Sequence, residues 1–221
     1  MIGQALAYVA ERPSEFLDAL RIHVALSAAA LALAIALAVP LGIVVSRRPV
    51  GALLAINGGN LAKTVPSLAV LALMLPVLGT GFGPALVALV LLALPPVLIN
   101  TIVALTRVDV DVADAARAMG MTPRQAVRRV ELPLALPVVF AGIRIAAVEV
   151  VASATLASFI GGGGLGDFIT AGIALSEMSQ LLVGAVPVAL LTVATELGFS
   201  LLQRSMTPAG LKSGGLRGVA A

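Results

Sequence analysis

A few charged and polar side chains stand inside long apolar runs of this sequence. Lys63, Arg144, Glu149 and Glu196 are the charged ones. An unpaired charge is costly in lipid, so each is expected to face protein or water, and structural ion pairs fit as well as transport roles. The sequence alone does not pair them. His23, the single histidine, stands near one end of an apolar run, where a structural role is expected.

Several kinds of chemistry are excluded by composition and context. With no cysteine and one histidine, disulfides, thiolate metal sites and cysteine nucleophiles drop out. Gly161, Gly163 and Gly166 have dinucleotide-fingerprint spacing but follow a predicted membrane helix, not a β-strand. Lys63-Thr64 resembles the end of a phosphate-binding loop, yet Ala62 stands where a glycine is required. We therefore expect no ATP or other cofactor on this chain.

The elements that position these residues are predicted to be membrane helices. Hydrophobic residues make up 60% of the 221 residues and charged residues 11%, against about 25% charged in soluble domains. Apolar runs of about 20 residues are long enough to cross a bilayer as helices. We predict an all-α polytopic membrane protein, a single transmembrane domain over 1–221. Its expected spans are 22–45, 50–78, 85–105, 134–160 and 180–202.

The second expected span contains residues that weaken or break a helix. Asn57 to Asn60 form one interruption and Lys63 to Ser67 another, so this span should be kinked or discontinuous. Broken backbone in a membrane is tolerated where it lines a cavity, although a packing kink without ligand contact fits equally. The candidate pathway residues are Asn60, Lys63, Thr64, Pro66, Ser67, Asn100, Thr101, Glu149 and Ser153. For Asn100, Thr101 and Ser153, helix packing is the favoured use.

Basic residues are distributed unevenly about these spans. Most of the 14 fall on one side of the predicted membrane: Arg47, Arg48, Arg107, Arg117, Arg124, Arg128, Arg129, Arg204, Lys212 and Arg217. The positive-inside rule makes this side cytoplasmic. The N-terminus is then outside, and the C-terminus and the loop 107–133 are inside.

That loop carries the signals of two short helices. Asp111 is expected to cap the first, with Asp114 in its first turn and Gly120 ending it. Thr122 to Gln125 has the form of a capping box with proline at the first helical position. On the first helix, one side gathers Val112, Ala115, Ala116 and Met119. An ordinary solvated loop is the alternative to a projecting apolar knob.

The spacing of Asp114-Ala115-Ala116, Gly120 and Val130-Glu131-Leu132-Pro133 resembles the EAA signature of binding-protein-dependent ABC import permeases. It differs by Asp for Glu and Val for Ile. The resemblance implies a type I importer fold in which the first loop helix docks on a separate ATPase subunit. The coupling-loop residues carried over are Asp114, Ala115, Ala116, Gly120, Val130, Leu132 and Pro133.

The resemblance extends from Lys63 to about Gly172. The stretches 63–69, 94–101, 142–144 and 160–167 are similar to permeases for osmoprotectants such as glycine betaine, choline, carnitine and proline betaine. Lys63 stands where that branch often has Gln. Aromatic faces usually hold quaternary ammonium groups, and this chain has no Trp and one Tyr. High-affinity selection is therefore expected on a separate extracellular or periplasmic binding protein.

The resemblance also implies the assembly. This chain is expected to be a non-enzymatic transport subunit in a bacterial inner membrane, with a second permease subunit, identical or paralogous. Two ATPase subunits carry ATP and Mg, and no nucleic acid is involved. The alternatives are a permease for methionine or another amino-acid-like solute, an ion-coupled secondary transporter or channel that uses the intramembrane charges, and a structural scaffold.

Overall fold

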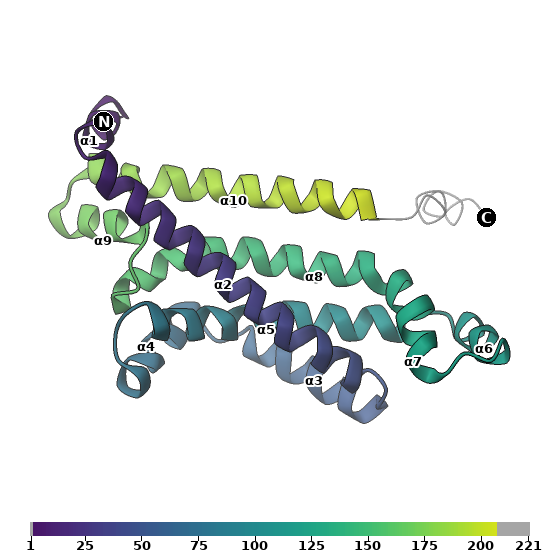
Figure 1. The fold of residues 1–221 in the computed structure, drawn as a ribbon. Coiled ribbons are helices and arrows are strands. Elements are labelled where there is room, and N and C mark those ends of the chain that lie inside the picture. Colours follow the sequence, from purple (N-terminus) through teal and green to yellow (C-terminus); the bar gives the residue numbers. More distant parts are fainter. Residues whose placement is uncertain (1, 207–221) are drawn as a thin grey trace, which may run out of the picture.

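The long apolar runs fold into helices, and the computed structural model describes residues 2–206 (Figure 1). Among these residues there is no strand. In chain order the helices are α1 (Ile2–Glu11), α2 (Pro13–Val45), α3 (Pro49–Ala62), α4 (Ser67–Leu78), α5 (Phe82–Thr106), α6 (Val110–Ala118), α7 (Pro123–Ala126), the π-helical turn η1 (Val127–Glu131), α8 (Leu132–Ser153), the 3₁₀ segment η2 (Ala154–Ile160), α9 (Gly166–Leu175) and α10 (Met178–Met206). Of the basic residues expected on the cytoplasmic side, Lys212 and Arg217 lie outside the described residues.

Within residues 2–206, four helical stretches are long and apolar enough to cross a membrane: Pro13–Val45, Phe82–Thr106, Pro123–Ile160 and Met178–Arg204. The pair α3 and α4, bent by 92° at their junction, gives a fifth if the two count as one broken span. The prediction of an all-α membrane protein with about five spans is confirmed.

Two helices extend well beyond the limits of the expected spans. The helix α2 begins at Pro13, before the expected span at residue 22. The fixed φ of proline suits the first position of a helix, and the negative charge of Glu15 is stabilised at the positive end of the helix dipole. The fourth begins at Pro123 instead of residue 134, so much of the expected loop is helical. Its turn η1 lies just before Pro133, which has no N–H for a regular helical bond.

The second expected span breaks once rather than twice. Asn57-Gly58-Gly59-Asn60 stays helical within α3, and the chain turns only at residues 63–66. A Cβ at Gly59 would lie 3.0 Å from Cδ1 of Ile99, so this glycine lets α3 pack closely on α5. The break itself coincides with Pro66, which cannot continue a helical hydrogen-bond ladder.

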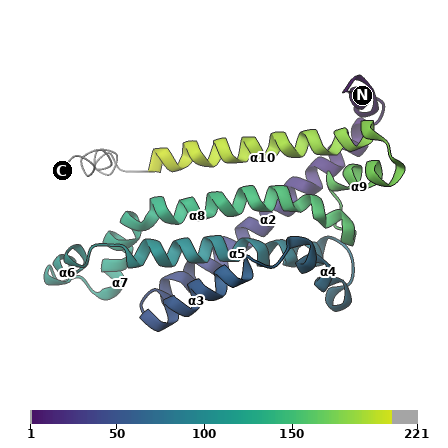
Figure 2. The same ribbon diagram turned by 180° about the vertical axis from the view of Figure 1, so that it is seen from behind.

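The centre of the bundle is made by α2, α5 and α8. The helices α5 and α8 run side by side, and α2 crosses them in both views (Figures 1 and 2). Small residues let these helices approach, as is usual for membrane helices. A Cβ at Gly42 would lie 2.7 Å from Cγ2 of Thr101, and one at Gly142 would lie 2.5 Å from Cβ of Asn100. Alanines fill most of the core along α2 and α5: Ala30, Ala34, Ala38, Ala85, Ala88 and Ala93.

The two ends of the bundle differ. At one end α6 and α7 project beyond the long helices, and at the other lie α1 and α9 (Figure 1). A glycine-rich turn follows η2, and Gly161, Gly163 and Gly164 adopt the positive φ values 71°, 74° and 100°. The short helix α9 that follows was not predicted. The N–H of Gly81 donates to the carbonyl of Ile160 (2.7 Å), which ties this end together.

Candidate functional site

The loop helix α6 begins at a different cap from the one expected. Asp109 is its N-cap, and the Asp109 carboxylate accepts the N–H of Asp111 at 2.9 Å. Asp111 therefore lies in the first turn, where the helix dipole stabilises its negative charge. Asp114 lies further along and accepts a hydrogen bond from Arg117 at 2.8 Å. The sequence allows either Asp109 or Asp111 as the cap, because both are aspartates and they are two residues apart.

The predicted turn after α6 is confirmed. Gly120 has a φ of +82°, a conformation that glycine adopts without steric cost, and its N–H donates to the carbonyl of Arg117. Thr122 and Gln125 form the predicted capping box, with the Thr122 N–H donating to Oε1 of Gln125 at 2.9 Å. The loop therefore has a defined shape of two helices joined at a tight bend.

The surface of α6 is partly apolar although it projects away from the long helices (Figure 1). Of the predicted knob residues, Ala116 is buried, and Ala115 is exposed. Met119 is 71% exposed and Val112 is 39% exposed. Exposed apolar side chains gathered on one short helix are typical of a protein contact. We call the exposed surface of Val112, Ala115 and Met119 the α6 surface.

The base of the loop is fixed to α2 by a residue that the sequence reasoning did not single out. Glu131 is the last residue of η1 and lies between Val130 and Leu132 in the sequence. It is 4% exposed and forms an ion pair with Arg47, which lies just after α2. Nη2 of Arg47 lies 2.5 Å from Oε2 of Glu131, and Nη1 lies 3.4 Å from Oε1. One sequence signal could have identified Glu131: it is an acidic residue that follows a basic stretch and directly precedes an apolar helix. Pro133, the last residue of the motif, is exposed.

Most of the predicted pathway residues line one cavity of about 420 Å³ at the α3–α4 break. We call it the break cavity. Lys63, Thr64, Pro66 and Ser67 come from the break and the start of α4, and Glu149 and Ser153 come from α8. Its remaining wall is largely apolar and includes α5. Residues distant in sequence thus meet at the discontinuity.

Three predicted pathway residues are outside this group. Asn60 is exposed on α3 and is not in the cavity wall. Nδ2 of Asn100 donates to the carbonyl of Pro96 at 2.8 Å, and Oγ1 of the buried Thr101 donates to that of Val97 at 2.7 Å. Because Gly142 packs on Asn100 and Gly42 on Thr101, both polar residues serve helix packing.

The charges within the expected spans separate into two groups. Arg144 on α8 pairs with Glu196 on α10, with Nε and Oε2 3.4 Å apart. Nη1 of Arg144 also donates to Oε1 of Gln203 at 3.2 Å, so this cation joins the two helices. Lys63 and Glu149 make no ion pair within 4.0 Å in the described part of the chain. Their charges face the break cavity instead.

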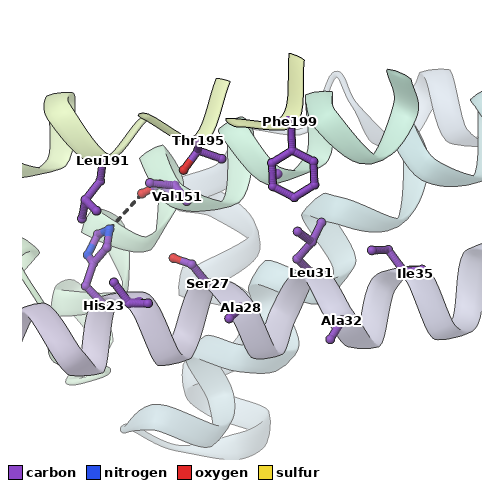
Figure 3. A pocket seen from close by; sticks show the side chains of 12 residues that line it. His23, Ser27, Ala28, Leu31, Ala32, Ile35, Val151, Leu191, Thr195 and Phe199 are labelled. Atoms are coloured by element: carbon purple, nitrogen blue, oxygen red, sulfur yellow. Dashed lines mark hydrogen bonds between the residues drawn. The ribbon is translucent and has the colours of Figure 1, made fainter. Parts of the chain in front are cut away.

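His23 lies beside a second cavity, of about 370 Å³, between α2, α8 and α10 (Figure 3). The ring is 1% exposed, and Nε2 lies 3.0 Å from the carbonyl oxygen of Val151. A carbonyl only accepts, so Nε2 carries the proton. His23 therefore holds α2 to α8, which agrees with the structural role expected for it. Nothing in the sequence had indicated the cavity, whose wall is mostly apolar.

Comparisons with known proteins fit this arrangement. Residues 30–208 match the family described as binding-protein-dependent transport system inner membrane component. The choline transport system permease protein OpuBB of Bacillus subtilis is 43% identical over 86% of this chain and 88% of its own. The carnitine transport permease protein OpuCB of Listeria monocytogenes is 44% identical over 86% and 87%. The osmoprotectant import permease protein OsmW of Salmonella typhimurium is 38% identical over 86% and 91%.

Solved structures share the fold at lower sequence identity. A chain of the MetNI methionine ABC transporter in an inward-facing conformation has a TM-score of 0.75 at 22% identity, covering 88% of this chain and 97% of that one. A chain of an amino acid ABC transporter gives 0.73 at 20% identity, covering 90% and 97%. The predicted type I importer permease fold is confirmed. The chain belongs to the family of inner membrane components of binding-protein-dependent transport systems, the membrane permeases of ABC transporters.

Proposed function

We propose that this chain is the membrane-spanning subunit of an ATP-driven importer for quaternary ammonium osmoprotectants such as glycine betaine, choline, carnitine and proline betaine. The observation that carries the mechanism is the α6 surface, an apolar patch on a short helix at one end of the bundle. The solute class is supported by the names of relatives that are 38% to 44% identical.

The α6 surface is the docking site for an ATPase subunit, which supplies ATP and Mg. Exposed Ala115 allows close approach, and Val112 and Met119 provide apolar contact area. Asp114 and Arg117 form an ion pair at 2.8 Å, so these two side chains add no net charge beside the patch. Ala116 is buried, and its carbonyl accepts the N–H of Met121, so it holds α6 to the following turn. Gly120 sets the angle between the helices.

The base of the loop transmits movement of α6 to the spans. From Pro123 to Ile160 the chain is one helical stretch, which includes Val130, Leu132, Pro133 and Glu149. A shift of α6 therefore reaches the break cavity through a continuous element, with Arg47 and Glu131 carrying it also to α2. Alternating access follows when two ATPase subunits close and open on two permease subunits.

The break cavity lies on the solute path, lined by Lys63, Thr64, Pro66, Ser67, Glu149 and Ser153. Its charged wall is compatible with lipid surroundings only if a second permease subunit or water covers it. Asn60, Asn100 and Thr101 are left out of the proposed path. A separate binding protein delivers the solute from outside.

The orientation follows from the arginines near α6. Arg107, Arg117, Arg124, Arg128 and Arg129 all lie at or near this end of the bundle. The positive-inside rule then puts α6 in the cytoplasm, and α1 with the N-terminus outside. The C-terminus lies on the cytoplasmic side.

Uptake by the assembled complex tests this function. A tagged chain is purified from its own membranes with the subunits that accompany it, and the complex is placed in proteoliposomes. We expect ATP-dependent accumulation of at least one of glycine betaine, choline and carnitine. Accumulation of methionine alone would establish the amino-acid alternative. Uptake by the isolated chain, driven by an ion gradient without ATP, would establish a secondary transporter.

A further inference from the structure

The break cavity carries charges of opposite sign on different helices. Lys63 is the C-cap residue of α3, and Glu149 is on α8. The two side chains line the same space of about 420 Å³. Neither forms an ion pair within 4.0 Å in residues 2–206. Both charges therefore remain available to a solute that enters the cavity.

The Lys63 side of the cavity favours an anionic group. The helix α4 starts there at Ser67, and its N-cap residue Pro66 provides no side-chain cap. The first N–H groups of a helix have no helical acceptor and form the positive end of its dipole. Half-helices in transporters use such ends to hold carboxylates. Lys63 adds a full positive charge on the same wall.

The α8 side of the cavity favours a cationic group. Glu149 is half-buried, with Ser153 one helical turn further along α8. Leu91, Leu92 and Pro95 from α5 line the remaining apolar wall. A quaternary ammonium group has a positive charge, an apolar surface and no N–H to donate. A carboxylate beside apolar side chains suits both the positive charge and the apolar surface of such a group.

We propose that the break cavity selects solutes by charge distribution: Lys63 with the start of α4 receives a carboxylate, and Glu149 receives an ammonium group. A small zwitterion compensates both charges at once. A monovalent cation such as choline compensates only Glu149 and leaves Lys63 uncompensated. Because this rests on the proposed import function, it adds a selection step inside the permease to that of the binding protein.

The test compares one zwitterion and one cation in the same complex. Initial ATP-driven uptake of glycine betaine and of choline is measured at saturating concentrations in proteoliposomes. Two unit charges about 4 Å apart attract each other more strongly in a partly buried site than in water. Removing the charge of Lys63 should therefore change the rate ratio by about tenfold or more. We expect Lys63→Gln to lower glycine betaine uptake while choline uptake holds or rises. Glu149→Gln should lower both.

The controls separate charge from general damage. Lys63→Arg keeps the charge and should keep the wild-type ratio. Glu11→Gln in α1 and Arg21→Gln near the start of α2 each remove an exposed charge outside the break cavity. Both variants should leave the two uptake rates unchanged. Co-purification of the other subunits with each variant checks assembly.

The two levels of the hypothesis fail differently. If the wild-type complex accumulates none of glycine betaine, choline and carnitine, the proposed function is wrong and the charge selection falls with it. If the wild type accumulates both glycine betaine and choline but Lys63→Gln leaves their rate ratio unchanged, or if it accumulates choline and no glycine betaine, only the charge selection is wrong.

Discussion

Arg47 and Glu131 join the end of the first long helix to the base of the projecting loop. Nη2 of Arg47 lies 2.5 Å from Oε2 of Glu131, and the two residues are 84 positions apart in sequence. The Glu131 side chain is 5% exposed, whereas that of Arg47 is 40% exposed. The pair therefore places a buried carboxylate in the π-helical turn and leaves its partner partly in contact with solvent.

This asymmetry gives the first prediction. Removing one partner of a buried ion pair costs about 3–5 kcal/mol, and less where the remaining charge reaches water. Arg47→Ala leaves the buried carboxylate alone and should lower the unfolding temperature in detergent more than Glu131→Gln does. The double variant should recover part of the loss. Strictly additive effects would show that the two residues do not interact.

Gly120 gives a second prediction, because its φ of +82° is open to few residues. Asn tolerates this conformation, whereas a β-branched or bulky residue does not. Gly120→Asn should keep most ATP-driven uptake. Gly120→Val should reduce it, and Gly120→Trp should abolish it while the protein still inserts. Normal uptake by Gly120→Trp would contradict the coupling role of this loop and would favour a structural scaffold.

The cap of α6 gives a third prediction. Loss of an N-cap aspartate costs about 0.5–2 kcal/mol, and asparagine caps almost as well as aspartate. In the purified chain, Asp109→Ala should speed tryptic cleavage after Arg117 about fivefold, since local opening exposes that bond. Asp109→Asn should cleave at the wild-type rate. Equal rates for Asp109→Ala and Asp109→Asn would mean that this side chain does not hold the helix start.

Close helix packing gives a fourth prediction with a matched control. A Cβ at Gly142 would meet the Pro96 carbonyl oxygen at 2.7 Å, whereas Gly58 has nothing within 4 Å. Overpacking of this kind costs about 1–3 kcal/mol. Gly142→Ala should therefore lower the unfolding temperature in detergent, and Gly58→Ala should leave it unchanged or raise it. A similar loss for both variants would point to a general intolerance of alanine.

Local signals in the sequence were sufficient for the helical class, the turn at Gly120 and the capping box from Thr122 to Gln125. Each depends on a few adjacent residues whose conformational preferences agree. The sequence analysis did not identify the start of α2, because hydropathy alone does not register a helix that continues beyond the expected span into polar residues as far as Pro13. The cap of α6 was misassigned because Asp109 and Asp111 are equally good caps when only the sequence is considered.

Tertiary relationships were harder to predict. Gly58-Gly59 looks like a helix breaker, yet close packing of Gly59 on Ile99 keeps this stretch helical. The proximity of Lys63 and Glu149 depends on how α3, α5 and α8 pack together, which no local pattern encodes. The same holds for Arg47 with Glu131 and for Arg144 with Glu196. Asn100 and Thr101 were uncertain for a related reason, since a polar residue in a span can face a path or a neighbouring helix.

The most direct test of the central claim is a crosslink from the α6 surface. The chain has no cysteine, so one introduced thiol is unique. In the intact complex, Met119→Cys with a short heterobifunctional reagent should crosslink to an ATPase subunit, and Ser176→Cys at the opposite end should not. Two results would contradict the docking of α6 on a cytoplasmic ATPase. One is that Met119→Cys gives no crosslink while Ser176→Cys reacts with the ATPase. The other is labelling of Met119→Cys from outside intact cells.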